Sequence, residues 1–329
     1  MESHPAKDVH RQPIDRLSTS SDAAEDRCVG TCDRLRGAEK AMLVTIIVPA
    51  YNEEAGISRV LSGLKTGGTD LSDIEIVVTA NGCTDRTAAV ARDFGVRVVE
   101  IEQASKTAAL NAAEAVSGAG HRIYLDADTV VSPELIRSLV DAVSAAGVEA
   151  AVPRLHLVYR DSSWPVRAYY AINERLPVFD NRLFGRGVIA LSENARRRFD
   201  RFPDITADDM FLDAIVRADE KTEIDADVPV QVPRSTGQLI RRLARARHGN
   251  VEFWRFVRSA PAGYGALSDP VPGPSRWSWL RTVLRGEPHL IPAAACYVSI
   301  TLLAELRRRS PRFAVRSGWG REPRTPVAA

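Results

Sequence analysis

Short apolar runs alternate with amphipathic stretches over the first half of the chain. Four of the runs are rich in β-branched residues and predict buried strands, at residues 42–48, 74–78, 96–99 and 122–125. A helix is expected after the first run, starting at Asn52 or Glu53, and an alanine-rich helix at 107–116. Because strand and helix alternate, we expect an α/β fold with a doubly wound, mixed but mostly parallel sheet flanked by helices.

The same pattern divides the chain into three parts. Residues 1–41 are polar, mixed in charge and lack an apolar core run, so we expect a disordered extension and no signal peptide. Residues 42–250 carry the α/β pattern. Residues 251–329 are rich in Pro, Gly and Arg and predict a basic, partly helical C-terminal extension.

The apolar run from Leu290 to Ala304 is the main feature of this extension. It contains Pro292, is followed by three arginines and is about fifteen residues long, short of the roughly 20 residues needed to span a bilayer. Two interpretations stay open: a packing helix of the core, and an interfacial helix lying on a membrane. The aromatic stretch from Trp164 to Tyr170 is expected at the surface, where it could stack on a sugar or lie against a lipid.

Composition limits the class of protein. The 329 residues suffice for one large domain or two small ones, and 45% of them are hydrophobic, as in ordinary globular proteins. Four scattered cysteines do not suggest a disulfide framework or a zinc site, which favours a reducing cytoplasm. We expect a cytoplasmic protein, with a peripheral position on the inner face of the membrane as the alternative.

Charge is distributed unevenly along the chain. The net charge is +2, but from Arg234 onward there are seventeen arginines, no lysine and five acidic residues, a balance of +12. A basic rear half fits an anionic partner such as a phosphate group or an anionic membrane surface. Nucleic acid is not expected, because no helix-turn-helix, zinc finger or RNP-type aromatic motif is present.

Candidate chemistry gathers where the predicted strands end. Asp126 and Asp128 follow the fourth run, and Ser132 with Pro133 already supplies the next helix start. Mg²⁺ and Mn²⁺ prefer such carboxylate oxygens and accept phosphate oxygens as further ligands, so this segment predicts a metal or nucleotide site. The segments 49–53 and 81–85 also follow strands, at the sheet edge where doubly wound folds bind ligands.

Other nucleotide-binding motifs are missing. No Gly-x-Gly-x-x-Gly follows the first strand, and no Walker A motif occurs anywhere in the chain. Nicotinamide and flavin chemistry are therefore disfavoured.

Four motifs taken together resemble family 2 glycosyltransferases. They are Pro-Ala-Tyr-Asn-Glu-Glu at 49–54, Asn-Gly-Cys-Thr-Asp at 81–85, Lys-Thr-Ala-Ala-Leu-Asn at 106–111 and Asp-Ala-Asp at 126–128. The resemblance covers about residues 43–250. It implies a GT-A fold and the transfer of a sugar from a nucleoside diphosphate donor, with inversion at the anomeric carbon and usually with Mg²⁺ or Mn²⁺.

The resemblance also implies roles for single residues. Asp128, together with Asp126, would ligate the metal, which holds the charge of the leaving diphosphate. Asp209 would take the proton of the acceptor hydroxyl as catalytic base, next to Asp208, although a plain helix N-terminus is the alternative for this pair. The nucleotide-sugar site would be lined by Pro49, Tyr51, Glu53, Asn81, Lys106, Asp126, Gly187 and Arg245.

Two departures from the family pattern bear on specificity. Asn81 stands where the family commonly has an Asp that reads the imide N–H of uracil; its amide oxygen can still accept that bond, so a UDP-sugar remains favoured. The Gln-x-x-Arg-Trp motif of processive synthases is absent, and its nearest match, at 242–246, lacks Gln and Trp. We therefore expect transfer of a single hexose to a hydroxyl acceptor, and a lipid-linked or small hydrophobic acceptor would suit the basic C-terminal part.

Two other functions remain as alternatives. A sugar-phosphate nucleotidyltransferase has a similar core, but it would carry a Gly-rich basic loop after the first strand, where this chain has Pro49-Ala50-Tyr51-Asn52. A non-catalytic protein that binds sugar nucleotides or membranes would be expected to have lost the metal or base carboxylates, which are all present here.

Overall fold

The structure, a computed structural model, describes residues 44–176, 182–259, 264, 267 and 287–310. These residues belong to one unit that begins at Leu43. The disordered extension expected at residues 1–41 lies outside the described residues.

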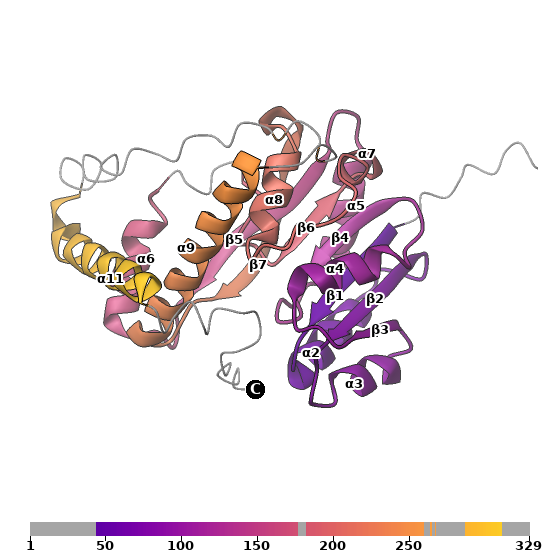
Figure 1. The fold of residues 1–329 in the computed structure, drawn as a ribbon, viewed down its shortest axis with the longest axis horizontal. Coiled ribbons are helices and arrows are strands. Elements are labelled where there is room, and N and C mark those ends of the chain that lie inside the picture. Colours follow the sequence, from indigo (N-terminus) through magenta and orange to yellow (C-terminus); the bar gives the residue numbers. More distant parts are fainter. Residues whose placement is uncertain (1–43, 177–181, 260–263, 265–266, 268–286, 311–329) are drawn as a thin grey trace, which may run out of the picture. The chain divides into compact units, whose positions relative to one another are not determined.

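Seven strands form a single sheet in the order β3-β2-β1-β4-β6-β5-β7 (Figure 1). In chain order the strands are β1 (Val44–Ala50), β2 (Ile74–Asn81), β3 (Arg97–Ile101), β4 (His121–Leu125), β5 (Ala150–Val158), β6 (Val188–Leu191) and β7 (Lys221–Gln231). Neighbours pair in parallel except β6, which runs antiparallel to both β4 and β5. The predicted mixed, mostly parallel sheet is confirmed.

The four predicted strands appear as β1 to β4, with ends shifted by up to three residues. The largest shift is at β2, which continues past Val78 to Asn81 because its parallel pairing with β1 extends to Ala50 and Ala80. This extension matters for the site, since it fixes the start of the loop that follows β2.

Helices cover both faces of the sheet (Figure 1). Their bounds are α2 (Glu54–Lys65), α3 (Thr87–Asp93), α4 (Lys106–Glu114), α5 (Pro133–Ser144), α6 (Trp164–Asn173), α7 (Glu193–Arg196), α8 (Asp208–Ile215), α9 (Thr236–Ser259) and α11 (Ile291–Arg309), with 3-10 turns η2 (Ala218–Glu220) and η3 (Pro288–Leu290). Side chains of β1 alternate between two cores. Ile46 packs with α2 and α5, whereas Ile47 packs with Leu110 of α4 and Phe211 of α8.

The C-terminal half differs from the sequence expectation in two respects. Tyr169 and Tyr170, expected at the surface, are buried in a third core because α11 packs over α6 and Tyr297 stacks on Tyr169 at 4.8 Å between ring centroids. α11 also extends to Arg309, so the segment Pro288–Arg309 is long and apolar enough to cross a membrane by length and composition. The division at residue 250 stays a prediction, although α9 runs through it.

Candidate active site

The Asp-Ala-Asp loop sits at the carboxyl end of β4, beside β6. The backbone N–H of Asp126 donates to the carbonyl of Gly187 at 2.8 Å, and the carbonyl of Asp126 accepts from the N–H of Thr129 at 3.0 Å. The first bond joins the loop to Gly187, which directly precedes β6, and the second closes a tight turn within the loop. Asp126 is left half-exposed and Asp128 exposed, so both carboxylates can meet a ligand from solvent.

Lys106 connects this loop to a second acidic segment. It is the first residue of α4, whose N-terminus is capped by Ser105, with the Ser105 hydroxyl accepting from the N–H of Ala108 at 3.3 Å. The Lys106 ammonium lies 2.7 Å from Asp126 Oδ1 and 2.9 Å from Asp208 Oδ2. The side chain therefore bridges two carboxylates that are 82 positions apart in the sequence.

Asp208 and Asp209 open α8, where the positive end of the helix dipole favours acidic residues. Asp209 is held by two backbone donors: the N–H of Gly185 reaches its Oδ2 at 3.2 Å and the N–H of Met210 its Oδ1 at 2.8 Å. Asp208 is buried against Lys106, whereas Asp209 is only partly buried. Asp208 is therefore held by an internal ion pair, whereas Asp209 lies next to the loop at 182–187.

The electrostatics of this cluster set Asp209 apart. Desolvation, together with the negative charges of Asp208 and Asp126, raises its pKa to about 6, against an ordinary value of 3.8. Desolvation also raises the pKa of Asp208, with Lys106 acting in the opposite direction. Burial works against the charge of Lys106, but Asp126 and Asp208 outweigh it and raise the pKa of the ammonium. A carboxylate with a pKa near 6 is suited to accept a proton at neutral pH.

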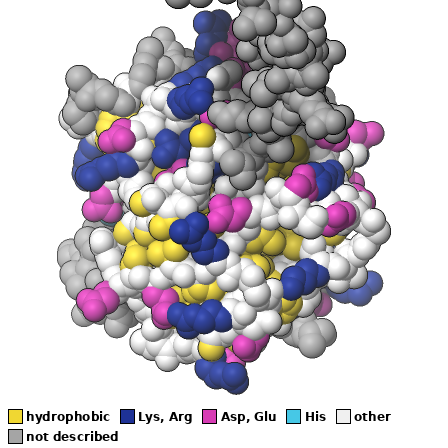
Figure 2. Space-filling view, turned by 90° about the vertical axis from the view of Figure 1, so that its right-hand side faces the viewer, with side chains coloured by type: hydrophobic (Ala, Val, Ile, Leu, Met, Phe, Trp, Pro, Cys, Tyr) yellow, Lys and Arg dark blue, Asp and Glu magenta, His cyan; other side chains and the backbone are white. Residues whose placement is uncertain are grey.

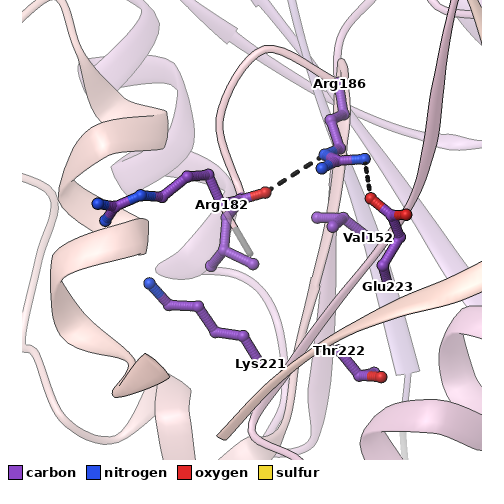
Figure 3. A pocket seen from close by; sticks show the side chains of 7 residues that line it. Val152, Arg182, Arg186, Lys221, Thr222 and Glu223 are labelled. Atoms are coloured by element: carbon purple, nitrogen blue, oxygen red, sulfur yellow. Dashed lines mark hydrogen bonds and ion pairs between the residues drawn. The ribbon is translucent and has the colours of Figure 1, made fainter. Parts of the chain in front are cut away.

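The loop that carries Gly185 and Gly187 is anchored by ion pairs, of which the pair between Arg186 and Glu223 is drawn in Figure 3. Asp213 of α8 binds Arg182 at 3.1 Å and Lys221 at 2.9 Å, and it also accepts from the N–H of Leu183 at 2.9 Å. Arg186 turns inward, where its guanidinium donates to the carbonyl of Pro153 at 2.6 Å and pairs with Glu223 at 2.5 Å. Two ion-pair clusters thus fix the loop on β5 and β7.

A recess lies among these side chains, but it is too small for a substrate. Its cavity volume is only about 10 Å³, about the room that one water molecule needs and far below the roughly 300 Å³ at which ligand pockets begin. We interpret it as the packing gap beneath the loop.

Gly187 is required at its position by the Asp-Ala-Asp loop. Its φ is +74°, and a Cβ there would lie 2.2 Å from the Thr129 hydroxyl oxygen. A side chain at 187 would therefore push the loop away from the strand. Gly187 acts on the site through this close approach, not through a side chain of its own.

The motif at 49–54 forms the opposite wall. Asn52 adopts a φ of +48°, and its side-chain oxygen accepts from the N–H of Thr84 at 2.8 Å, which joins the loops after β1 and β2. Pro49 belongs to buried β1, and Tyr51 and Glu53 are half-buried beyond it. A carboxylate oxygen of Glu53 and the carbonyl of Ala127 both lie within 3 Å of where a Cβ on Gly56 would stand. Glu53 therefore adjoins the Asp-Ala-Asp loop.

Asn81 lies at the bottom of the same wall. It is fully buried, and its amide N–H donates to the carbonyl of Ser105 at 3.0 Å. Within the described part of the chain its amide oxygen has no hydrogen-bond partner. A buried acceptor without a partner is costly, and the role of Asn81 in reading the base stays a prediction.

α9 packs against the segment that leads to Asp208 and Asp209. Glu252 accepts from the N–H of Thr206 at 3.0 Å and pairs with His248 at 3.1 Å. Gly249 lets the helix come close, since a Cβ on it would lie 3.3 Å from the Cβ of Ala207. Arg245 is half-buried one turn earlier on the same face. His248 and Glu252 are therefore bound to each other, and the contact of Arg245 with a ligand stays a prediction.

A divalent cation fits the exposed end of the cluster. Among the described residues, no three His, Cys, Asp or Glu side chains gather so as to hold a metal by themselves. Mg²⁺ commonly binds one or two carboxylates and takes its other ligands from substrate phosphates and water. Asp126 and Asp128 supply two accessible carboxylates of this type.

Comparison with known proteins identifies a similar family. Residues 45–198, just under half of the chain, match the family model described as glycosyl transferase family 2. These residues are therefore similar to glycosyltransferase family 2. Among curated proteins it is 26% identical over 132 residues to glycosyltransferase AglE, and 29% identical over 150 residues to the low-salt glycan biosynthesis hexosyltransferase Agl6, both of Haloferax volcanii. These matches cover 38% and 45% of the chain and 43% and 36% of the relatives, less than half of either.

A solved structure shows the same fold as this chain. The mannosyltransferase PcManGT from Pyrobaculum calidifontis, solved with GDP-Man and Mn²⁺, superimposes with a TM-score of 0.53 at 19% identity. The similarity covers 83% of this chain and 78% of PcManGT. The GT-A fold implied by the sequence motifs is confirmed.

Several contacts that build the site are not visible in the sequence, although some of the residues that make them belong to its motifs. Asn111 grips the backbone of Phe202 with both ends of its amide, donating to the carbonyl at 3.0 Å and accepting from the N–H at 2.8 Å. This contact ties the Lys106 helix to the segment that leads to Asp209. The spacing of His248 and Glu252 is visible in the sequence, but their target, the N–H of Thr206, is a tertiary contact that spacing alone does not reveal.

Proposed function

We propose that this protein is an inverting glycosyltransferase that moves a single hexose from a nucleoside diphosphate sugar to a hydroxyl acceptor. The observation that carries the proposal is the position of Asp209, a carboxylate with a pKa of about 6 that is held next to the glycine loop. Its neighbour Asp208 is joined to Asp126 of the Asp-Ala-Asp loop by the ion pairs of Lys106. In a single displacement the base must take the acceptor proton as the hydroxyl attacks. Asp209 is the base, held by the backbone N–H groups of Gly185 and Met210, and its neighbour Asp208 is anchored by the ion pair with Lys106.

A divalent ion, Mg²⁺ or Mn²⁺, would be held by Asp128 and Asp126. When bound, it supplies positive charge to the leaving diphosphate. Lys106 lies between Asp126 and Asp208, so its charge is offset by theirs, and the positive charge that meets the diphosphate would come from the bound ion. Glu53, Tyr51 and Pro49 form the nucleoside side, and Asn81 offers its amide oxygen to the base.

A UDP-sugar is the proposed donor, because the amide oxygen of Asn81 can accept the imide N–H of uracil. PcManGT was solved with GDP-Man, which makes a guanosine donor the first alternative to test. For the acceptor we propose a lipid-linked or small hydrophobic molecule, and for the protein a cytoplasmic or peripheral location at the inner face of the cell envelope. The basic C-terminal part and the apolar α11 support this location.

The test is a transfer assay with UDP- and GDP-hexoses, Mn²⁺ and an alkyl glycoside as a hydrophobic hydroxyl acceptor. We expect release of the nucleoside diphosphate and, by NMR, a product whose anomeric configuration is inverted. Asp209→Asn should lower the rate by about 10²- to 10⁴-fold and leave donor binding in place. Retention of configuration, or full activity of Asp209→Asn, would contradict the proposal.

The same assay separates the two alternatives. A nucleotidyltransferase would release pyrophosphate from a nucleoside triphosphate and a sugar 1-phosphate. A non-catalytic binding protein would bind the nucleotide without releasing any product.

A further inference from the structure

One side of α11 is exposed and almost entirely apolar. The exposed residues between the start of the helix and its arginines recur every three or four positions and include a single polar side chain. This set, called here the α11 stripe, consists of Ile291, Pro292, Ala295, Val298, Ser299, Leu302, Leu303 and Leu306. Leu302 and Leu306 are 58% and 66% exposed. A row of large apolar side chains left in water at this density indicates an interaction surface.

The opposite side of α11 is bound to the enzyme. Ala294, Ile300 and Ala304 are buried against α6 and α9, and Arg247 of α9 donates to the carbonyl of Thr301 at 3.0 Å. Although the helix is long enough to cross a membrane, a helix packed along one side on its own domain can offer only the other side to lipid. This geometry fits a helix that lies in the membrane surface.

Charge at the end of the stripe selects the kind of surface. Arg307, Arg308 and Arg309 follow directly, and of nearby acids Glu305 pairs with Arg308 and Arg309. The sequence continues with four arginines and one glutamate over residues 311–329. On the face viewed in Figure 2, taken from the side of the molecule away from α11, basic and acidic side chains are instead interspersed. Cations next to an apolar row complement anionic lipid headgroups.

An exposed tryptophan, Trp164, is the first residue of α6, on which α11 packs. Trp164 is 65% exposed, and the carbonyl of its neighbour Pro165 accepts from the thiol of Cys296 on α11. Tryptophan is favoured at the boundary between headgroups and acyl chains.

We propose that the α11 stripe, with the arginines that end the helix, is a docking surface for an anionic bilayer. The apolar side chains enter the boundary between headgroups and acyl chains, and the arginines bind lipid phosphates. This inference gives the proposed membrane location its partner surface; it rests on the proposed function only for its biological use, because docking itself requires no sugar transfer.

The position of α9 connects this surface to the active site. Arg247 contacts α11, whereas Gly249 and Glu252, on another side of the same helix, contact the segment that leads to Asp209. An α-helix with its side chains is about 10 Å across. A docked α11 therefore holds the catalytic segment about one helix diameter from its own packed side, within reach of an acceptor that extends from the headgroup layer.

The test is co-sedimentation of the full chain with vesicles of phosphatidylcholine, alone or mixed with phosphatidylglycerol. The test variant is Leu302→Gln with Leu306→Gln, which removes apolar area without changing charge. The matched control is Ser62→Gln with Ser138→Gln, two exposed positions on α2 and α5. A third variant, Arg307→Gln with Arg309→Gln, probes the charge.

We expect wild type and the serine control to sediment with the mixed vesicles and more weakly with phosphatidylcholine alone. The leucine variant should lose at least about tenfold in partition coefficient, and the arginine variant should lose its preference for phosphatidylglycerol. Failure of wild type to sediment, or equal binding by the leucine variant, would overturn the proposal. Light scattering without lipid tests whether a second copy of the chain occupies the stripe. A wild-type dimer that the leucine variant converts to monomer would assign the stripe to that second copy and overturn the proposal.

Because these measurements involve no sugar transfer, their failure leaves the transferase proposal intact. An inactive protein that still binds vesicles would contradict only the proposed function.

Discussion

Replacing Asp209 with Asn should make the protein inactive and, relative to wild type, more stable as the pH rises. The folded state raises the pKa of Asp209 from 3.8 to about 6. A group whose pKa is raised on folding binds more protons in the folded state, so stability falls as pH rises between the two values. The ionised carboxylate is thus a cost that the folded enzyme carries at neutral pH, and Asn removes it.

The magnitude follows from the size of the shift. At 1.36 kcal/mol per unit, a shift of about 2 units corresponds to about 3 kcal/mol. Asp209 is partly exposed, so solvent screening reduces this to about 1–2 kcal/mol. Asn can replace only one of the two oxygens that accept from Gly185 and Met210, which costs about 1 kcal/mol. That loss does not depend on pH, so the comparison between two pH values isolates the carboxylate.

The assay is urea denaturation of wild type and Asp209→Asn at about pH 4.5, in the lower part of the window between 3.8 and about 6, and at about pH 7.5, above that window. The free energy of unfolding of the variant, minus that of wild type, should be larger at the higher pH by about 1–2 kcal/mol. Asp204→Asn, at an exposed position on the same segment, should show no such change. An equal difference at both pH values would refute the account of Asp209.

Three further predictions concern the same cluster. The rate of transfer, measured as kcat/KM across pH, should fall below about pH 6 because Asp209 must be ionised to act as base; a flat profile down to pH 5 would exclude it from that role. Lys106→Met leaves Asp208 buried and unpaired, and should lower the free energy of unfolding at neutral pH by about 2–4 kcal/mol in urea titrations; a loss below about 1 kcal/mol would mean that the bridge is not formed. Gly187→Ala meets Thr129 and should cost more than about 2 kcal/mol. The control Gly147→Ala, at a φ of +84° with open space around it, should cost about 1 kcal/mol, and equal losses would argue against the close approach.

The central strands β1 and β4 could be predicted from sequence because they are buried on both faces. Continuous β-branched runs such as 44–48 carry that signal locally, and the Asp-Ala-Asp segment could be placed at a strand end by the same reasoning. The acidic pair at 208–209 was found by its motif context. Whether Asp209 is the base remains a prediction, because nothing but its geometry and pKa speaks for it so far.

The contacts inside the site could not be predicted, since they join segments far apart in the chain. The bridge from Lys106 to Asp208 and the bond from Gly185 to Asp209 depend on how α4, α8 and the glycine loop meet at the sheet edge. The burial of Tyr169 could not be predicted for the same reason. The sequence of α6 does not show that α11 packs over Tyr169 and Tyr170. The local sequence pattern predicts the helices and strands, whereas the electrostatics of the site depend on tertiary packing.

The most direct test of the account is a thermal-shift matrix of UDP, GDP and their hexose conjugates, with and without Mn²⁺, on wild type and Asp128→Ala. A ligand at 100 times its Kd adds about 2.7 kcal/mol to stability, enough to raise the melting temperature visibly. We predict a shift with one nucleotide that requires Mn²⁺ and is lost in Asp128→Ala. A shift of equal size in the variant, or none with any nucleotide, would contradict a metal-assisted nucleotide-sugar site at Asp126 and Asp128.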